Sequence, residues 1–246
     1  MPTMLEPILD IDTTNRVLET YDPAGVVAWA ARQFGGDGLI MSSSFGAESA
    51  LLIHMANEVV PGIRIVFVDT GYLFPETHRF MEELRQRFDL NVWTYRTRND
   101  PIAYLAAAGE TDPTFRENIE ACCDANKNEP FERALLELKP KAWLRGIRRH
   151  QADTRRARQV VEWSDRYECY AISPLLNWTR RDIHNYMKRH DLPYHPLYEK
   201  GYASIGCNPL SCTRPIQLGE APRAGRWSGT PKTECGLHLE GDGSGI

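Results

Sequence analysis

The chain has little of what marks several large classes of protein. No apolar run approaches the roughly 20 residues that a membrane-spanning helix needs. The amino end, MPTMLEPILDID, lacks the basic and then apolar layout of a secretion signal. Basic residues are not in excess, since 29 Lys and Arg stand against 33 Asp and Glu and give a net charge of −4. We therefore expect neither a membrane protein nor a general nucleic-acid binder.

Cysteine is also scarce, with six in 246 residues. In a chain of this length without a secretion signal, so few cysteines indicate a reducing cytoplasm, where thiols react or bind metals. No internal repeat or low-complexity linker divides the sequence. We expect one cytoplasmic domain over residues 1–240, with a distinct C-terminal segment at about 201–240 and a flexible tail at 241–246.

The chain does contain alternating strand and helix patterns. Short apolar or β-branched runs predict strands at 38–41, 63–68, 91–95 and 142–145. Apolar residues at helical spacing predict helices at 23–34, 48–59, 75–88, 129–138 and 180–190. This alternation predicts an α/β fold, a parallel sheet flanked by helices. Regular periodicity fades beyond Pro193, so the C-terminal segment is expected to be irregular.

Two loops that follow predicted strands carry polar groups suited to an anion. Ser42–Gly46 offers hydroxyls, backbone N–H groups and a glycine just before a helix, although such a turn also serves as a plain helix cap. Asp69–Thr77 is longer than a tight turn requires. Neither loop matches a Walker loop or a GxGxxG fingerprint. Ligands of open α/β sheets bind beyond the carboxyl ends of strands, so both loops are candidates to line a ligand site.

Four of the cysteines fall in two clustered pairs. Cys122 and Cys123 are adjacent, and four residues separate Cys207 from Cys212. Two pairs of thiolates bind zinc or an iron–sulfur cluster, and spacing alone separates these poorly. The plain structural alternative is two buried thiols in a helix and two incidental ones.

The two remaining cysteines invite different interpretations. Cys235 lies near the chain end in a polar, glycine-flanked stretch between Lys232 and His238. An exposed segment with cationic neighbours is typical of a nucleophilic thiolate. Cys169 stands alone in the apolar stretch 167–176, which predicts a core position.

Taken together, the two loops resemble the adenosine-binding elements of the adenine nucleotide alpha-hydrolase-like superfamily, of the PP-loop type. Within it the chain is most similar to the adenylyl-sulfate and phosphoadenylyl-sulfate reductases, over roughly residues 38–238. The motifs that carry the resemblance are Cys122-Cys123 with Lys127, Trp143–Gln151 (WLRGIRRHQ), Pro174-Leu175 with Trp178, Pro193–Leu197 (PYHPL), Gly201–Cys207 (GYASIGC), Arg223–Trp227 (RAGRW) and Glu234–His238 (ECGLH).

The resemblance implies the thiol-dependent reduction of adenylyl sulfate to sulfite and AMP in sulfate assimilation. The Cys235 thiolate would attack sulfur, AMP would leave, and thioredoxin or glutaredoxin would then release sulfite from the thiosulfonate. The segment at 201–240 would thus be catalytic. A 4Fe–4S cluster is also implied, with iron bound through Cys122, Cys123, Cys207 and Cys212. Relatives with the cluster usually place two residues between the downstream cysteines, so the four found here are a departure.

Substrate-binding positions follow from the same resemblance. Bidentate guanidinium donors suit the oxygens of a sulfuryl and a phosphate group. Three other arginines, Arg155, Arg156 and Arg158, are expected only to coat the surface. The expected substrate-binding residues are Ser42, Ser44, Phe45, Gly46, Asp69, Gly71, Lys127, Gly146, Arg148, Arg223, Arg226 and His238.

Three other functions compete with this interpretation. The same chemistry on 3′-phosphoadenylyl sulfate is the nearest, and by resemblance the cysteine pairs favour adenylyl sulfate. An ATP-using adenylating or thiolation enzyme would typically show Ser-Gly-Gly-x-Asp-Ser, whereas Ser44–Ser49 reads SFGAES. A non-enzymatic metal-binding regulator would hold a metal without any reaction at Cys235. The sequence leaves the reductant and a homo-oligomeric state open.

Overall fold

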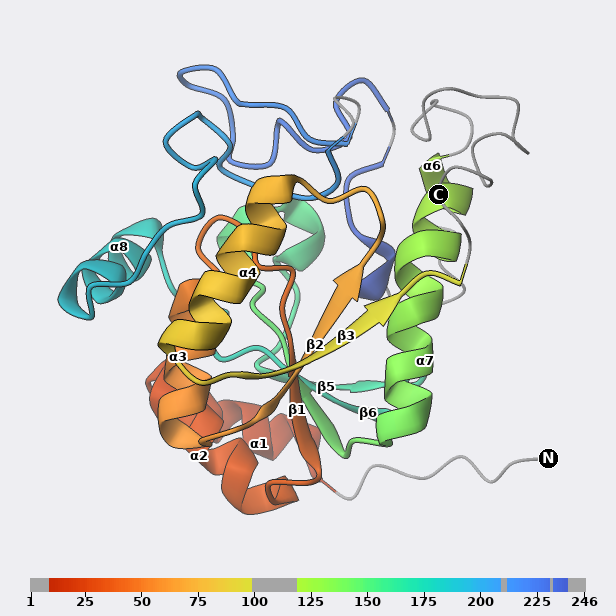
Figure 1. The fold of residues 1–246 in the computed structure, drawn as a ribbon. Helices are drawn as coiled ribbons and strands as arrows, with labels where there is room; N and C mark the ends of the chain where they lie inside the picture. Colours follow the sequence, from red (N-terminus) through yellow and green to blue (C-terminus); the bar gives the residue numbers. More distant parts are fainter. Residues whose placement is uncertain (1–8, 99–118, 209–211, 231, 239–246) are drawn as a thin grey trace.

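The computed structural model describes residues 9–98, 119–208, 212–230 and 232–238. Within them one sheet has the strand order β3-β2-β1-β4-β6-β5 (Figure 1). All neighbours pair in parallel except β5, which is antiparallel to β6 at the edge. The strands are β1 (Leu39–Ser42), β2 (Arg64–Asp69), β3 (Asn91–Arg96), β4 (Ala142–Leu144), β5 (Val161–Ser164) and β6 (Cys169–Ile172).

Side-chain caps begin two of the flanking helices. The Asp22 side chain accepts a hydrogen bond from the Gly25 backbone, and Thr179 forms a capping box with Asp182. A π-helical turn over Asp124–Asn128 joins α6 directly to α7. The helices are α1 (Ile11–Leu18), α2 (Pro23–Phe34), α3 (Ala50–Val59), α4 (Pro75–Arg87), α6 (Ile119–Cys123), α7 (Glu129–Leu138) and α8 (Arg180–Arg189).

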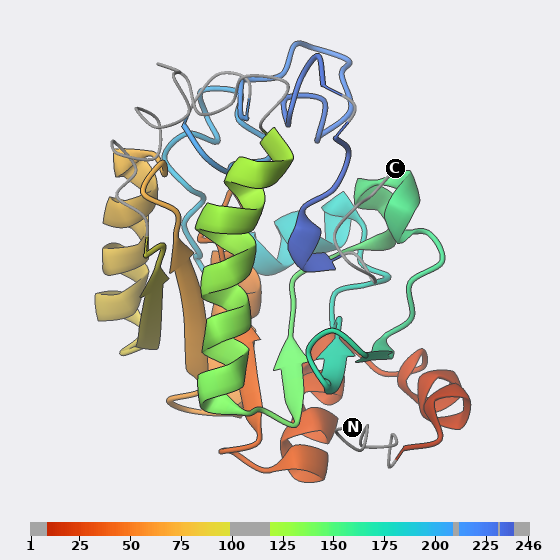
Figure 2. The same cartoon turned by 90° about the vertical axis from the view of Figure 1, so that its right-hand side faces the viewer.

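Alternate residues along the strands bury opposite faces of the sheet. Met41 and Phe67 belong to the core beneath α2, α3, α4 and α8, whereas Ile40 and Val66 belong to the core beneath α7. Figure 2 shows α7 on one side of the sheet and the orange and yellow helices on the other. Both faces are therefore covered, as parallel sheets require.

The expected parallel α/β fold is confirmed, and the predicted strands and helices lie within about two residues of their observed bounds. The sequence reasoning missed α1, β5 and β6. The β5–β6 turn has no Asn-Gly or Asp-Gly signal, and Glu168 takes its left-handed conformation at φ 48°. Asn15 of α1 exchanges two hydrogen bonds with the Val161 backbone, at 2.8 and 2.9 Å, so this helix covers the edge of the sheet.

The segment after Pro193 crosses the carboxyl ends of the strands, at the top of Figure 1. An isolated bridge joins Cys207 to Leu73 in the loop after β2, and a second joins Thr213 to Arg226. This irregular segment therefore forms the roof over the strand ends. The predicted tail at 241–246 and the domain limit at 240 lie outside the described residues. In the part of the chain that the structure describes, no helix is long and apolar enough to cross a membrane.

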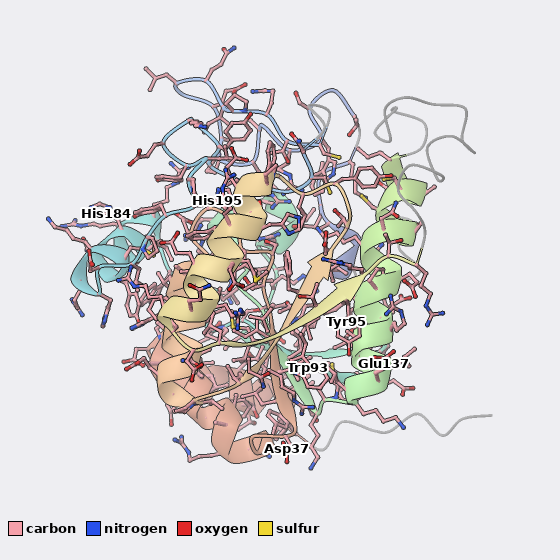
Figure 3. All side chains as sticks on the ribbon, in the orientation of Figure 1. Asp37, Trp93, Tyr95, Glu137, His184 and His195 are labelled. Carbon is pink, nitrogen blue, oxygen red and sulfur yellow. The ribbon has the colours of Figure 1, made fainter. Side chains whose placement is uncertain are left out.

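His195 fixes the start of that roof and is only 1% exposed. Its Nδ1 accepts a hydrogen bond from the Leu197 backbone at 3.1 Å, and its Nε2 lies 3.1 Å from the Thr77 hydroxyl of α4. Figure 3 labels His195 at the upper part of α4. The Phe80 ring lies 5.2 Å away. Burial lowers the pKa of His195 from 6.5 to about 4, so the ring is neutral in the folded protein.

This neutral histidine should make stability depend on pH. Below pH 6.5 the unfolded chain takes up the proton while the folded protein resists it down to about pH 4. The free energy of unfolding should therefore fall by about 2–3 kcal/mol as the pH drops through that window. A His195→Asn variant, measured by urea unfolding between pH 4 and 8, should show a flatter profile there. The control is His150→Asn, because His150 is exposed, and its unfolding free energy should change with pH as in wild type. The same pH dependence in all three proteins would contradict the role of His195 in stability.

Candidate active site

A cavity lies where the strand order reverses. From β1 the chain continues to β2 on one side, and it later returns to β4 on the other side of β1. A crevice therefore opens beyond the carboxyl ends of these strands. The loop after β1 and the loop after β4 form the floor, and residues 203–207 and 223–227 form the roof. Cys235 lies in the wall of this same cavity.

The loop after β1 is held in a strained shape by Phe45. This residue has a φ of 46°, in the left-handed region that costs a non-glycine residue about 1–3 kcal/mol. Its fully buried ring packs edge-on against Phe67 at 5.2 Å, and its N–H donates to the Ser43 hydroxyl at 3.0 Å. Phe45 therefore shapes the loop from beneath. The predicted binding residues Ser42, Ser44 and Gly46 line the cavity, as does Gly146.

Asp69 and Gly71 shape the loop after β2 and do not line the cavity. The Asp69 carboxylate accepts hydrogen bonds from the Gly71 N–H at 3.1 Å and from the Arg96 guanidinium at 3.0 Å. Gly71 has a φ of 78°, which favours glycine. Thr70 and Leu73 of this loop reach the cavity instead.

Lys127 places its ammonium group beside the candidate nucleophile. It comes from the π-helical turn, and it lines the cavity together with Cys235. Burial opposes the charge of Lys127, but the sulfurs of Cys235 and Cys207 raise its pKa above the ordinary value. This cation is therefore held in its charged form against a sulfur atom.

Arg226 lies flat against the roof of the cavity. Its guanidinium donates to the Cys212 and Ile205 carbonyls at 3.1 and 3.2 Å and lies 4.4 Å from the centre of the Trp227 ring. A Cβ at Gly206 would come within 2.3 Å of Nη2 of Arg226, so glycine at this position makes room for the guanidinium. The GYASIGC and RAGRW motifs thus build one surface.

Arg148 reaches the cavity from the loop after β4. Nη2 lies 2.5 Å from the Glu48 carboxylate, and both residues line the cavity. Nη1 is buried and has no hydrogen-bond partner among the described residues. Since a buried donor normally has a partner, this nitrogen is available to an oxygen of a ligand.

Cys235 is buried, with 8% of its surface exposed, rather than in the exposed segment that the sequence predicts. Its N–H donates to its neighbour Glu234 at 2.8 Å. A Cβ at the next residue, Gly236, would come within 2.4 Å of the Asn128 amide, so the chain passes close to the turn that carries Lys127. A short 3₁₀ turn follows Cys235 over Gly236–His238. The backbone of His238 ends this turn, and the His238 side chain lies outside the described part of the structure.

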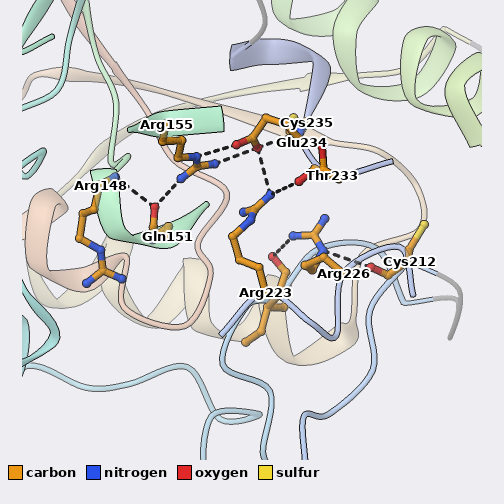
Figure 4. A network of polar contacts seen from close by, with 10 residues as sticks. Arg148, Gln151, Arg155, Cys212, Arg223, Arg226, Thr233, Glu234 and Cys235 are labelled. Atoms are coloured by element: carbon orange, nitrogen blue, oxygen red, sulfur yellow. Dashed lines mark hydrogen bonds and ion pairs between the residues drawn. The ribbon is translucent and has the colours of Figure 1, made fainter. Parts of the chain in front are cut away.

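Arg155 is not a surface residue, which corrects the expectation from sequence. It is only 5% exposed, lines the cavity and pairs with Glu234, which lies 79 residues further along the chain (Figure 4). Arg156, by contrast, is exposed. Sequence reasoning missed Arg155 and Glu234, although Glu234 lies within the ECGLH motif. No local pattern marks a pair so distant in sequence.

Arg223 completes the group of cavity cations. Burial lowers the pKa of its guanidinium to about 10, while the carboxylate of Glu234 opposes that shift. Nη2 of Arg223 donates to that carboxylate at 3.0 Å. Its Nε is buried without a hydrogen-bond partner in the described part of the structure. Arg223, like Arg148, therefore has a donor left for a ligand.

Interaction with Cys212, together with the Thr70 hydroxyl 3.4 Å from the Cys207 sulfur, lowers the pKa of Cys207. The same interaction between the two cysteines raises the pKa of Cys212. Burial raises the pKa of Cys123 to about 12, and this thiol interacts electrostatically with Cys207. Cys169 is fully buried in the core, as predicted.

The structure shows no single-metal site among the four paired thiols. Among the described residues, no group of three or more His, Cys, Asp or Glu side chains is arranged to hold a metal ion. Cys122, the first of the four, is buried, and its sulfur lies 3.6 Å from the Asn126 amide. The cluster stays a prediction from the resemblance, and no step below passes through it.

Fold and cavity together define an α/β protein with a PP-loop type, nucleotide alpha-hydrolase-like fold. Three solved structures share this architecture, with differing degrees of similarity. A phosphoadenylyl-sulfate reductase from Candida auris matches with a TM-score of 0.70 and 26% identity, covering 80% of this chain and 93% of that one. Two structures of FMN adenylyltransferase from Candida glabrata, the second in complex with ATP, match at TM-scores of 0.59 and 0.58 with 18% and 19% identity, covering 89% of this chain and 71% of each. At that identity they show the fold alone.

Sequence comparison is more specific. Residues 38–215 match the phosphoadenosine phosphosulfate reductase domain. A phosphoadenosine 5′-phosphosulfate reductase from Xylella fastidiosa is 42% identical, covering 95% of this chain and 96% of the relative. One of the same name from Synechococcus is 39% identical, covering 97% of this chain and the whole relative. The chain belongs to the phosphoadenosine phosphosulfate reductase family and is an oxidoreductase of that family.

Proposed function

We propose that the chain reduces 3′-phosphoadenylyl sulfate to sulfite and 3′-phosphoadenosine 5′-phosphate. The observation that carries the proposal is the position of Cys235 in one cavity with Lys127, Arg223 and Arg226. The names of the relatives favour the 3′-phosphorylated substrate over the adenylyl sulfate that the paired cysteines suggested.

The first step is a displacement at sulfur. The Cys235 thiolate attacks the sulfuryl sulfur, an S–S bond forms, and the bond from sulfur to the bridging oxygen breaks. The electron pair leaves with the nucleotide phosphate. Lys127 supplies a positive charge near the Cys235 sulfur, and Arg223 and Arg226 face the charge that builds on the leaving oxygen.

The second step uses an external thiol. A thiolate of thioredoxin or glutaredoxin attacks the Cys235 sulfur, sulfite leaves with the bonding electron pair, and a mixed disulfide forms. The second thiol of that partner then restores Cys235 and supplies the remaining reducing equivalent. Because Cys235 is only 8% exposed, the segment that carries it has to open before a protein thiol can reach the sulfur.

The covalent intermediate gives the direct test of this function. Mixing the protein with 3′-phosphoadenylyl sulfate without reductant should release one nucleotide per chain and add a sulfonate to Cys235, located by peptide mass spectrometry. Cys235→Ser should abolish both signals because the nucleophile is gone. Cys169→Ser is the matched control and should retain both. Nucleotide release at an undiminished rate from Cys235→Ser would sink the proposal.

Substrate preference distinguishes the two sulfonucleotides. We expect kcat/KM for 3′-phosphoadenylyl sulfate to exceed that for adenylyl sulfate by at least about tenfold. Only the first substrate carries a 3′-phosphate, with which arginines of the cavity would pair. Initial rates of sulfite release with a fixed excess of thioredoxin measure both constants. The reverse preference would restore adenylyl sulfate as the substrate.

The 4Fe–4S cluster is a separate proposal and rests on the resemblance alone. Cys122 and Cys123 at the end of α6, with Cys207 and Cys212, would hold it. If the cluster forms, protein purified without oxygen should contain four irons per chain. Cys123→Ser should lose them and Cys169→Ser should keep them. Iron-free protein with full activity would contradict the cluster.

A further inference from the structure

One buried carboxylate joins the nucleophile to two of the cavity cations. Glu234 is 3% exposed, and its Oε1 accepts hydrogen bonds from the Cys235 N–H at 2.8 Å and from the Arg223 guanidinium at 3.0 Å. Arg155 adds a fork of two bonds to the same carboxylate, at 2.6 and 2.8 Å (Figure 4). Three separate parts of the chain therefore converge on this group.

The arrangement leaves net positive charge beside the cavity. Two guanidinium groups share one carboxylate, so the trio carries one excess positive charge. Without the carboxylate, two buried guanidinium groups would face each other uncompensated, which is costly in a site closed to water. Glu234 thus lets Arg155 and Arg223 stay charged and close together. The unpartnered Nε of Arg223 remains available to a ligand oxygen.

Arg155 is in turn held from its other side. Its Nη1 bonds to Gln151, whose side-chain oxygen also accepts from the Arg148 N–H at 3.1 Å. The chain of contacts therefore runs from the loop after β4, which carries Arg148, to Cys235 in the C-terminal segment (Figure 4). A shift of the carboxylate would move the sulfur and the anion-binding groups together.

We propose that Glu234 is a positioning residue for sulfuryl transfer, and that it sets the Cys235 sulfur relative to Arg155 and Arg223 through its one carboxylate. The role in transfer rests on the proposed function, whereas the anchoring of Cys235 does not. Glu234 acts through its neighbours and need not touch the substrate. Its loss should therefore slow transfer in addition to lowering stability.

The test compares two carboxylates that each bind a buried arginine, the buried Glu234 and the half-buried Glu162. Glu234→Gln removes the charge and keeps the size. The matched control is Glu162→Gln, because Glu162 on β5 pairs with the buried Arg145, and neither residue lines the cavity. Three quantities are measured on the full chain: the rate of nucleotide release without reductant, the rate of Cys235 alkylation by iodoacetamide, and the melting temperature.

We expect Glu234→Gln to release nucleotide about 100-fold more slowly, because small misplacements of reacting groups cost about that much. Its Cys235 should meanwhile alkylate at least about fivefold faster, because the segment is released and a negative charge beside the sulfur is lost. Glu162→Gln should match wild type in both rates while lowering the melting temperature to a similar degree. A merely structural role would not slow nucleotide release and speed Cys235 alkylation in Glu234→Gln while leaving both rates unchanged in Glu162→Gln.

Two results would overturn the proposal. One is nucleotide release from Glu234→Gln within about threefold of wild type, and the other is equal slowing in both glutamine variants. If Glu234→Gln does not fold, Arg155→Met replaces it and should show the same pair of opposite changes. If wild-type protein releases no nucleotide, the proposed function fails, and alkylation alone decides the anchoring: faster reaction in Glu234→Gln supports it, and an unchanged rate refutes it.

Discussion

A carboxylate buried as deeply as that of Glu234 has to be paired, and its partners decide where the C-terminal segment lies. The segment after Pro193 has little regular structure, so backbone ladders do not fix its path. The forked bond from Arg155 and the bond from Arg223 do so instead. Because breaking a buried ion pair of this kind costs about 3–5 kcal/mol, the segment is held firmly over the strand ends.

From that constraint the two halves of the site follow. The sheet supplies the floor, where the loops after β1 and β4 present hydroxyls, a glycine and Arg148 beyond the carboxyl ends of the strands. The C-terminal segment supplies Cys235, Arg223 and Arg226. Lys127 belongs to neither half but reaches the sulfur from the turn between α6 and α7. The candidate anion-binding groups and the candidate nucleophile Cys235 thus come from parts of the chain that only the tertiary fold brings together.

Much of the fold could be predicted because its signals are local. Central strands such as Arg64–Asp69 are buried on both faces and read as β-branched apolar runs. The loops at their ends were recognisable because parallel strands end at a common edge. By contrast, α1 and the β5–β6 hairpin are short, and their places depend on contacts such as that of Asn15 with Val161, which no local pattern reveals.

The sequence indicated the cations that line the candidate site, but it did not indicate which residues brace its loops and hold its parts together. Lys127, Arg223 and Arg226 lie in motifs and line the cavity, whereas Asp69 and Phe45 turn out to brace their loops. Arg155 resembles the arginines around it in the sequence. Only its burial against Glu234 separates it from them, and burial of a charge is set by pairing across the fold.

The account depends on Cys235 and the nucleotide sharing one cavity, and protection from alkylation measures this directly. The rate of iodoacetamide modification of each cysteine is followed by mass spectrometry, with and without saturating 3′-phosphoadenosine 5′-phosphate. The account predicts that bound nucleotide slows modification of Cys235 selectively, because it fills the space through which the reagent arrives. An unchanged rate at Cys235, with nucleotide binding confirmed by calorimetry in the same sample, would contradict it.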